Sequence, residues 1–441
     1  MLMSPTENSP APIPHAKTSP SGSPGVELLL PLICLGGLCV AAYLTVLHFS
    51  LLLGDLSVGA VCGRGAWGDC NSVVGSRYGR LLGLPLSVWG MGYYIAAGTM
   101  SSAIVLLRRA DARAFVRVLL YLTIVALLSD LYLAWVMWAR LERFCPLCGI
   151  TYGINALILV LGIVSFRHGP PGPGTLRAAF PSLAILLRPL DPAYYREVLK
   201  LFLAGLGVGG FALVVVLSLL VHRAVVQGEE AKLAGLLEYL KRAEPFSIDP
   251  TGRPSRGPAD APVTVAVFSD FMCEQCKRAS EYLDIVAVNH RGALRVVYLH
   301  YPVDAECNEY GGPTMHPGAC ELARAGACAH AQGRFWEFHD LVFAAPGQVK
   351  PERMEDYATR SGLDLPEFNA CRSAGSADPA ARADIALGHS VGVTVTPTIY
   401  LNGRPIVGAL KPWMLEAAIE TVRTLPLPPP PGENPQPSPL P

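Results

Sequence analysis

Two Cys-x-x-Cys pairs occupy different surroundings along the chain. Cys145-Pro-Leu-Cys148 opens a long apolar run, which places this pair at the mouth of a membrane helix. Cys273-Glu-Gln-Cys276 follows a strand-like run, 263–268, and precedes a helical pattern. Because both sulfurs of such a motif share the first turn of a helix, one thiolate can attack a mixed disulfide formed by the other. The helix N-terminus also lowers the pKa of the first thiol. The sequence therefore suggests an electron relay between a membrane dithiol and a soluble dithiol.

A third pair, Cys62 and Cys70, flanks the Gly-rich stretch 63–69. A flexible exposed loop that ends in cysteines can move between a soluble partner and the membrane dithiol. A static structural disulfide that closes an eight-residue loop is the alternative, and the spacing alone does not separate the two.

Composition points to a chain that lies partly in a membrane. Hydrophobic residues make up 51% and charged residues 16% of the 441 positions, a bias typical of such proteins. The formal charge is zero and no basic block is present, which argues against a nucleic-acid partner. Twelve cysteines, mostly in soluble or loop segments, favour an oxidising compartment. The first apolar run is too long for a cleavable signal and lacks a small-residue cleavage site.

Several runs reach the roughly 20 residues needed to cross a hydrocarbon core about 30 Å thick. They are 26–53, 85–107, 115–139, 146–166 and 199–222. Arginine and lysine are frequent at 108–117 and 167–200, so both segments are predicted to be cytoplasmic. This orientation places 54–84 and everything after 222 outside. We expect a multi-pass protein of the inner (plasma) membrane, with its soluble domain on the outer, periplasmic or extracytoplasmic, side.

The predicted organisation has seven parts. They are a disordered N-terminus at 1–25, a membrane domain at 26–166, a cytoplasmic connector at 167–198, a fifth transmembrane helix at 199–222, a tether and linker at 223–254, a soluble domain at 255–424 and a disordered Pro-rich tail at 425–441.

The membrane domain carries further motifs around its cysteines. They are Ser76-Arg-Tyr-Gly-Arg80, Leu84-Pro-Leu-Ser87 and Thr151-Tyr152. With the four cysteines, this pattern resembles the vitamin K epoxide reductase family over residues 26–166. The resemblance implies a four-helix bundle around a quinone of the ubiquinone or menaquinone type.

The same resemblance assigns roles to individual residues. It makes Cys145 and Cys148 the quinone-reactive pair, with Cys148 facing the quinone. It makes Cys62 and Cys70 the shuttle pair. Two further residues, Ser76 and Tyr152, match positions that lie near the quinone in the family.

The soluble part is predicted to have a thioredoxin fold. Strands are expected at 263–268 and 294–301, a helical insertion at 316–390, and a loop, strand and hairpin at 392–403. Pro397 is the expected cis-proline facing the Cys273 pair. The pattern Phe-x-Asp-x-x-Cys-x-x-Cys with Thr-Pro-Thr and Asn-Gly resembles DsbA-like oxidoreductases over 255–424. The expected fold class is therefore multidomain: an α-helical membrane four-helix bundle and a fifth transmembrane helix, followed by an α/β thioredoxin-like domain with a helical insertion.

Glu274 and Gln275 depart from that family, because many of its oxidants have proline and histidine between the cysteines. An adjacent carboxylate disfavours a thiolate. We therefore expect Cys273 to be less acidic, and its disulfide less oxidising, than in the strongest members.

The remaining cysteines have simpler interpretations. Among three possible connectivities of the soluble domain we favour Cys307–Cys320 and Cys328–Cys371 over a zinc site with His316 and His330, because the Cys/His spacings are irregular and the compartment is oxidising. No metal is expected.

Three residues inside the predicted spans also carry reactive or ionisable groups. Cys34 and Cys39 are expected to be apolar packing. Asp130, inside the third span, either serves the quinone site or pairs with hydroxyls of a neighbouring helix.

These observations predict a quinone-dependent thiol-disulfide oxidoreductase that forms disulfides in exported client proteins. Electrons would pass from Cys273–Cys276 through the loop and membrane pairs to a membrane quinone. One alternative is a quinone or quinone-epoxide reductase fed by the soluble domain, and another is a membrane-anchored holdase without a relay. The sequence does not identify the quinone, the clients or the balance between oxidation and isomerisation.

Overall fold

The computed structural model describes residues 24–62, 68–106, 109–168, 193–345, 350–375, 378–430 and 434–435. The chain divides into two compact units, which are considered separately. The first comprises Met1–Ala41, Trp89–Leu131 and Ile150–Val214, and the second comprises Ala42–Val88, Tyr132–Gly149 and Val215–Pro441. The predicted disordered N-terminus lies almost wholly outside the described residues, as do most of the cytoplasmic connector and the segment 63–67 of the Gly-rich loop.

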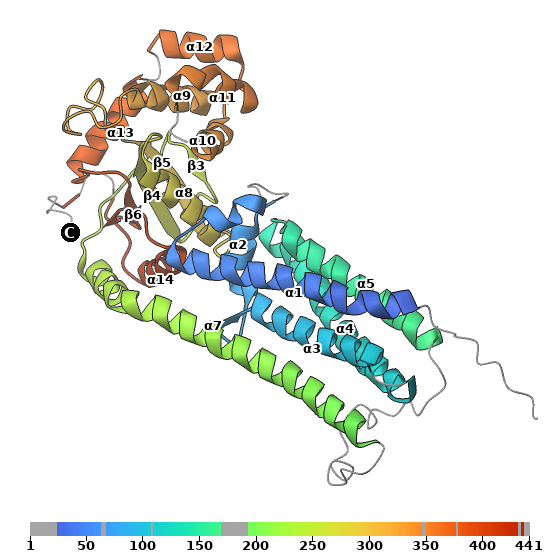
Figure 1. Ribbon diagram of the computed structural model, residues 1–441. Helices are drawn as coiled ribbons and strands as arrows, with labels where there is room; N and C mark the ends of the chain where they lie inside the picture. The colour runs from blue at the N-terminus through green and yellow to red at the C-terminus, as the bar shows by residue number, and fades with distance from the viewer. Residues whose placement is uncertain are drawn as a thin grey trace, which may run out of the picture. The chain divides into compact units, whose positions relative to one another are not determined.

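Long helices supply the first unit and continue into the second. They are α1 (Pro24–Leu53), α3 (Leu86–Leu106), α4 (Arg109–Val136), α5 (Pro146–His168) and α7 (Tyr194–Arg242). Figure 1 shows α1, α3, α4 and α5 running alongside one another, as the predicted four-helix bundle requires. In the first unit they enclose a core that includes Leu30, Tyr94, Leu119 and Ile158, each at most 3% exposed.

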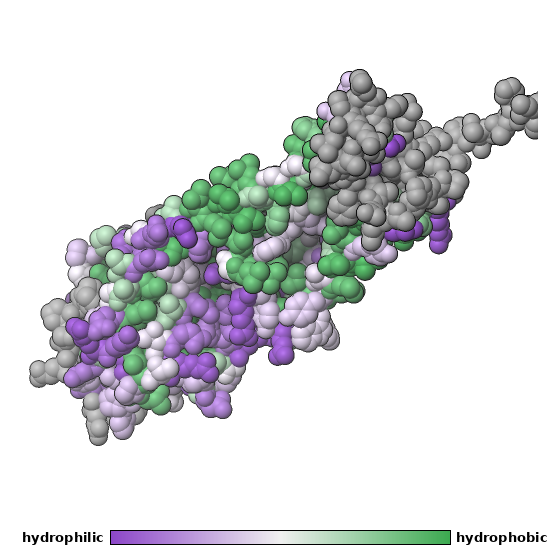
Figure 2. Space-filling model, turned by 90° about the horizontal axis from the view of Figure 1, so that it is seen from below, coloured by the Kyte–Doolittle hydropathy of each residue, from purple (hydrophilic) through white to green (hydrophobic). Residues whose placement is uncertain are grey.

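Several of these helices can cross a membrane by length and composition. The qualifying segments are Leu28–Leu53, Ala114–Leu141, Pro146–Arg167 and Tyr194–Arg242. Many of their apolar side chains face outward; Val208 is 73% exposed and Leu213 is 58% exposed. Figure 2 shows a wide hydrophobic area on one face of the molecule. The predicted second span forms α3 but is not among these four segments, so the count of five crossings stays a prediction.

The predicted fifth span and the helical part of the tether form one continuous helix. At 1.5 Å per residue, the 49 residues of α7 are about 70 Å long, more than twice the roughly 30 Å of a hydrocarbon core. No proline interrupts the helix, and Pro245 follows its end. One end of α7 must therefore extend well beyond any bilayer that the helix crosses.

Short elements of the second unit surround the membrane-domain cysteines. They are η1 (Ser57–Cys62), α2 (Cys70–Gly75), η2 (Arg77–Gly79), β1 (Arg80–Leu81), β2 (Leu84–Pro85) and η3 (Met137–Leu141). The turn after η3 places Glu142 at φ +47°, in the left-handed region, and ends the helical path shortly before Cys145. This break lets α5 begin anew with the Cys-x-x-Cys motif.

The soluble part of the second unit is built on a five-stranded sheet. Its strands are β3 (Ser255–Arg256), β4 (Val263–Ser269), β5 (Leu294–His300), β6 (Thr398–Leu401) and β7 (Arg404–Val407), in the order β3-β5-β4-β6-β7. Strands β4 and β5 are parallel, and the other pairings are antiparallel. The predicted strands are confirmed. The two-residue strand β3 was missed because Pro254 and Gly257 flank it and leave no run of strand formers.

Helices cover this sheet and form the predicted insertion. They are α8 (Glu274–Ala287), α9 (Ala319–Ala331), α10 (Phe335–Ala344), η5 (Pro351–Arg353), α11 (Met354–Arg360), α12 (Leu365–Ser373), α13 (Asp378–Ser390) and α14 (Pro412–Val422). Alternate residues of β4 face opposite sides. Val265 packs with Leu283 and Leu415 of α8 and α14, whereas Phe268 packs with Tyr301 and Tyr400 on the other side. This period of two makes β4 the central buried strand.

The segment predicted to be a linker packs against the soluble domain. The N–H of Phe246 donates to the carbonyl of Gly403 at 2.8 Å, and Phe246 is 5% exposed. A Cβ at Gly403 would clash with the carbonyl of Phe246, and Gly403 has φ +79°, so this contact requires glycine. Arg253 forms a 2.7 Å ion pair with Asp384. Residues after 245 therefore belong to the folded domain rather than to a free tether.

Candidate active site

The soluble dithiol lies at the start of α8. Cys273 is the N-cap residue, and its Sγ accepts the backbone N–H of Cys276 at 3.4 Å. The Sγ of Cys273 also contacts the carbonyl oxygen of Thr396 at 3.5 Å. Cys273 is 8% exposed and Cys276 only 1%, and both are free thiols in the structure. A client can therefore reach the first sulfur, while the second is placed to resolve a mixed disulfide.

The two thiols have opposite acidities. The hydrogen bond with the Cys276 side chain lowers the pKa of Cys273 to about 6, against the effect of burial, and backbone N–H groups of the helix start add to the lowering. Burial raises the pKa of Cys276, and the charge of Cys273 adds to this rise. Cys273 is the stable thiolate of the pair and the better leaving group.

The carboxylate beside Cys273 is well hydrated. The side chain of Glu274 is 66% exposed and lies 3.8 Å from Arg278, one turn along the helix. Solvent and the guanidinium therefore weaken its effect on the thiolate. The expected weakness relative to stronger oxidants stays a prediction, although Cys273 is more acidic than an ordinary thiol.

The predicted cis-proline is confirmed, because the Thr396–Pro397 bond is cis. It directly precedes β6, and the Thr396 carbonyl faces Cys273 as described above. An extended client strand can bond to the backbone at such a site.

Asp270, whose side chain is fully buried, organises the approach to the dithiol. Its carboxylate accepts the N–H of Met272 at 2.7 Å and the N–H of Val303 at 2.8 Å. His316 Nδ1 lies 2.8 Å from the same carboxylate. That hydrogen bond raises the pKa of His316. The sequence pattern included Asp270 without a role and considered His316 only as a zinc ligand, because nothing in the sequence brings these distant positions together.

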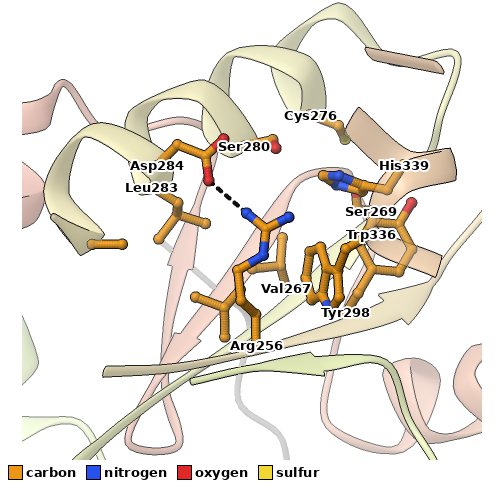
Figure 3. A pocket seen from close by; sticks show the side chains of 12 residues that line it. Arg256, Val267, Ser269, Cys276, Ser280, Leu283, Asp284, Tyr298, Trp336 and His339 are labelled. Carbon is orange, nitrogen blue, oxygen red and sulfur yellow. Dashed lines mark hydrogen bonds and ion pairs between the residues drawn. The ribbon is translucent and has the colours of Figure 1, made fainter. Parts of the chain in front are cut away.

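A cavity of about 40 Å³ lies behind Cys276 (Figure 3). Arg256 reaches into it from β3, donating to Asp284 at 3.0 Å and stacking 4.3 Å from the ring centre of Trp336. None of the residues lining this cavity except Cys276 was predicted to belong to the site. They come from β3, β4, α8, β5 and α10 and meet only in the folded domain.

The loop cysteine pair is held in place by a short helix. Cys62 and Cys70 form a disulfide, and Cys70 opens α2. Asp69 caps that helix by accepting the N–H of Ser72 at 2.9 Å. The backbone N–H of Asp69 donates to the carbonyl of Phe144 at 2.9 Å. These bonds fix the start of α2 beside the segment that carries Cys145.

The membrane Cys-x-x-Cys pair uses the same helix-start geometry as the soluble one. Cys145 and Cys148 form a disulfide at the beginning of α5, and the N–H of Cys148 lies 3.1 Å from the Sγ of Cys145. Cys145 and Cys70 are fully buried, and their Sγ atoms are 3.4 Å apart. The structure therefore brings the two predicted pairs together through these two sulfurs.

The two predicted quinone residues differ in their surroundings. Ser76 is 1% exposed, and its hydroxyl donates to the carbonyl of Val73 at 2.8 Å at the end of α2. Tyr152 lies one helical turn after Cys148 on α5 and is half-buried. The role of both residues at a quinone stays a prediction, and the hydroxyl of Ser76 already has a structural use.

Asp130 pairs with an amide rather than with hydroxyls. Asn155 Nδ2 donates to its carboxylate at 2.8 Å, and Asn155 Oδ1 accepts the Tyr94 hydroxyl at 2.9 Å. Cys34 packs in the core of the first unit, as expected. Cys39 is exposed on α1, so it does not share this core with Cys34.

The other four cysteines of the soluble domain form the favoured disulfides, Cys307–Cys320 and Cys328–Cys371. The oxidised sulfurs leave no thiolate set for zinc.

His290, Glu416 and Glu420 lie close enough together to hold a metal ion. Nε2 of His290 lies 3.0 Å from Glu416, and Nδ1 of His290 lies 3.8 Å from Glu420. Each carboxylate therefore lies beside a different nitrogen of the ring.

Comparison with known families matches both halves of the chain. Residues 28–163 match the vitamin K epoxide reductase family, and residues 250–421 match a thioredoxin family. The chain thus contains a vitamin K epoxide reductase family domain followed by a thioredoxin-like domain, as the sequence predicted. The closer resemblance to DsbA-like proteins stays a prediction.

Similar individual proteins cover only parts of the chain. The Na(+)/H(+) antiporter NhaA 3 of Salinispora tropica is 32% identical over 172 residues, 39% of this chain and 25% of that protein. The Na(+)/H(+) antiporter NhaA 1 of Mycolicibacterium gilvum is 30% identical over 186 residues, 40% of this chain and 28% of that protein. The chain thus spans about a quarter of the length of these curated relatives.

Solved structures resemble a similar share of the chain. Oxidised BdbD from Bacillus subtilis has 22% identity and a TM-score of 0.36, covering 41% of this chain and 98% of its own. A thioredoxin-like oxidoreductase from Silicibacter pomeroyi has 23% identity and a TM-score of 0.35, covering 40% of this chain and 95% of its own.

Proposed function

We propose that this protein forms disulfides in exported proteins and passes the electrons to a membrane quinone. The observation that carries the proposal is the 3.4 Å contact between Cys70 and Cys145, which joins a loop disulfide to a membrane disulfide. Structural disulfides have no need of such a contact. Sulfurs at this distance need little movement to exchange.

The relay begins at the soluble dithiol. A client thiolate attacks the oxidised Cys273, and the client's second thiol then releases Cys273 by forming the client disulfide. The thiolate of reduced Cys273 attacks Cys62, which frees Cys70 as a thiolate. Cys276 resolves that mixed disulfide by attacking Cys273. Two electrons have then moved from the client to the loop, and the soluble disulfide is restored.

The freed Cys70 is already in contact with the next pair. Its thiolate attacks Cys145, and Cys148 leaves as a thiolate. Cys62 then attacks Cys70 and releases Cys145, which completes the transfer of two electrons. The loop disulfide is restored, and the membrane pair is now a dithiol.

The start of α5 suits a quinone, which accepts two electrons and two protons when it is bound. Cys148 is half-buried at the first turn, and the Tyr152 hydroxyl lies one turn further along a predominantly apolar helix. A hydroxyl in an apolar slot can donate to a ring oxygen. The two thiols of Cys145 and Cys148 supply the two electrons and two protons.

The same geometry weighs against the alternatives. A membrane-anchored holdase has no use for a contact between two redox pairs, so the Cys70–Cys145 contact favours a relay over simple client binding. A quinone or quinone-epoxide reductase would use the same chemistry, with the soluble domain feeding it. We favour client oxidation because the accessible Cys273 has an acidic thiol, which is a good leaving group.

Location follows from the chemistry. The four apolar helices place the chain in a membrane, and we propose the inner (plasma) membrane with the thioredoxin-like domain on the outer side, where clients are exported. The partners are reduced exported proteins, the quinone and the lipid bilayer. Impermeant thiol labelling of a cysteine placed at residue 110 in intact cells tests the orientation, and strong labelling would contradict it.

Turnover with a defined oxidant tests the proposal. The purified full chain in detergent is mixed with excess reduced dithiol peptide, with or without a ubiquinone-type or menaquinone-type acceptor. We expect many turnovers with quinone and, without it, at most about one peptide for each oxidised redox pair, which is three per chain when the soluble, loop and membrane pairs are all oxidised. Equal peptide oxidation in both mixtures would overturn the quinone-dependent relay.

A further inference from the structure

Cys276 presents a chemical difficulty that the relay must solve. When a client thiolate attacks Cys273, Cys276 must leave with the electron pair of the broken S–S bond. Cys276 is 1% exposed, and burial raises its pKa well above the usual value, although hydrogen bonds with the N–H of Asp270 and with Ser269 oppose the rise. A buried thiolate of this kind is a poor leaving group unless a proton reaches it.

Water in the cavity behind Cys276 can carry that proton to the sulfur. The cavity volume of about 40 Å³ exceeds the roughly 10–15 Å³ that one water needs. Tyr298 Oη and Trp336 Nε1 belong to residues that line it, and both atoms are buried without a hydrogen-bond partner among the described residues. Buried polar groups of this kind normally bond to ordered water. The cavity is therefore suited to hold one or two waters beside the thiol.

The thiol of Cys276 and the carboxyl group of Asp284 lie on the same face of α8. Cys276, Ser280 and Asp284 are spaced four residues apart, so they lie in line along the helix, about 6 Å from one to the next. All three line the cavity, and Figure 3 shows the Ser280 side chain between the other two. A hydroxyl accepts and donates at once, so it can pass a proton between waters on either side. The side chain of Asp284 is 40% exposed, so this end reaches solvent.

Charged groups of β3, of α10 and of two loop segments act on Asp284. Loss of hydration in the crevice raises its pKa to about 7, which Arg256 of β3 opposes and Asp340 of α10 supports. The pair of Arg143 and Asp69 acts in opposite directions at longer range. A carboxyl group whose pKa is raised in this way can donate a proton as well as accept one.

His339 also lines the cavity but is less suited to be the donor. Its Nδ1 lies 2.8 Å from Asp340, and burial lowers its pKa, so the ring is neutral at pH 7. Tyr298, the remaining ionisable group of the lining, has a pKa raised by burial and holds its proton throughout.

We propose that Asp284 is the proton donor and acceptor for Cys276, acting through Ser280 and water in the cavity. As the client thiolate bonds to Cys273, the Cys273–Cys276 bond breaks and Cys276 takes its electron pair. The carboxyl proton of Asp284 moves along the line to Cys276, leaving a thiol and a carboxylate.

During reoxidation of the soluble pair, the proton moves in the opposite direction. Cys276 returns its proton to Asp284 and attacks Cys273, which releases the loop cysteine as a thiolate. The direction of electron flow in this reverse step rests on the proposed function.

A single-turnover reaction tests the inference independently of quinone. The full chain with Cys62→Ser and Cys70→Ser isolates the soluble pair, which is oxidised with oxidised glutathione and mixed with a dithiol peptide. The rate of Cys276 release, divided by the fraction of peptide thiol that is ionised, should fall as pH rises through about 7, because the acid form of Asp284 is lost. Asp284→Asn should be about tenfold slower at pH 6, which is less than a typical general-acid contribution. Its rate, corrected in the same way, should not change with pH.

Matched variants separate proton transfer from ion pairing. Asp340→Asn removes the other carboxylate that holds Arg256, at 2.9 Å, but Asp340 does not line the cavity. Because the charge of Asp340 supports the raised pKa of Asp284, this variant should keep the parent rate at pH 6 and lose it at a slightly lower pH than the parent. Ser280→Ala should slow the reaction severalfold with Asp284 intact, which covers the case that Asp284→Asn folds poorly.

Two outcomes would overturn the inference: an Asp284→Asn protein with the parent rate and profile, or an Asp340→Asn protein slowed to the same degree. Failure of the proposed function has a different signature. The intact chain would then show no quinone-dependent turnover, while the single-turnover result would still stand.

Discussion

The two Cys-x-x-Cys motifs share one backbone geometry, but the more deeply buried sulfur is the second in the soluble motif and the first in the membrane motif. In each, the first cysteine precedes a helix and its sulfur faces the N–H of the second. In the soluble motif the second sulfur, Cys276, is buried at 1% exposure behind the first. In the membrane motif the first sulfur, Cys145, is fully buried against Cys70, while Cys148 is half-buried. The spacing alone cannot reveal this reversal.

In the proposed relay, this reversal fits the points where electrons enter and leave each pair. Cys273 would meet clients, and the buried Cys276 would resolve the mixed disulfide. In the membrane pair the buried Cys145 would be the entry point, because its partner, Cys70, lies inside the protein. Cys148 would then be left for a second substrate.

Removing the entry sulfur should have the largest effect. Cys145→Ser leaves Cys70 without a partner, so client turnover with quinone should fall by at least about a hundredfold, as for the loss of a nucleophile. The soluble pair should accumulate in its reduced form, which alkylation followed by mass spectrometry reports. Normal turnover in Cys145→Ser would show that Cys145 does not receive the electrons from Cys70.

Removing the exit sulfur should trap the exchange instead of abolishing it. In Cys148→Ser, Cys145 has lost its partner within the motif, and its contact with Cys70 favours a disulfide between these two. We expect a Cys70–Cys145 peptide pair in non-reducing digests as the main product. A digest with Cys145 only as a free thiol would show that the contact does not support exchange.

A variant of Tyr152 tests the transfer of electrons to the quinone, with a smaller expected effect. Tyr152→Phe removes one hydroxyl that would donate to a ring oxygen as charge develops on it, a loss of about 1.4 kcal/mol or roughly tenfold in rate with quinone. Exchange between the soluble and loop pairs should not change. Ser76→Ala is the companion variant. Unchanged quinone rates in both variants would leave Tyr152 as an interfacial anchor.

The smallest expected effect concerns the exposed neighbour of Cys273. Alkylation of the soluble dithiol should be half-maximal near pH 6, since thiolate is lost below the lowered pKa of Cys273. Glu274→Gln should move this midpoint by less than about half a unit, because the carboxylate is largely solvated and paired with Arg278. A larger shift would mean that the residue between the cysteines controls their acidity.

The same lowered pKa has a consequence for stability with a definite sign. The thiolate of Cys273 stabilises the folded reduced form. That contribution is fully present above the unfolded thiol's pKa of about 8.5. It declines below that pH and is lost as pH falls through about 6.

Local patterns were sufficient to predict much of the fold. Strand β4 and helix α8 follow from an apolar run and a capped helical pattern, both within a few residues of Cys273. The redox pairs were recognisable because their chemistry requires short spacings. The connectivity Cys328–Cys371 was one choice among three, and the packing of α9 against α12 selects it in space.

The missing parts depend on tertiary contacts. His316 meets Asp270 across 46 positions, and Arg256 meets Asp340 across 84. No periodicity links such positions before the sheet and the insertion are folded. Helix α7 was divided in two because its apolar half and its polar half differ in composition, although nothing in its backbone breaks the helix.

The order in which the three pairs lose electrons tests the central claim most directly. The purified full chain is reduced completely, freed of reductant and mixed with quinone, and samples are alkylated over time for mass spectrometry. The relay predicts that Cys145 and Cys148 are oxidised first, Cys62 and Cys70 next, and the soluble pair last. In Cys70→Ser, only the Cys145 pair should be oxidised. Oxidation of the soluble pair first, or at the same rate in Cys70→Ser, would contradict the relay.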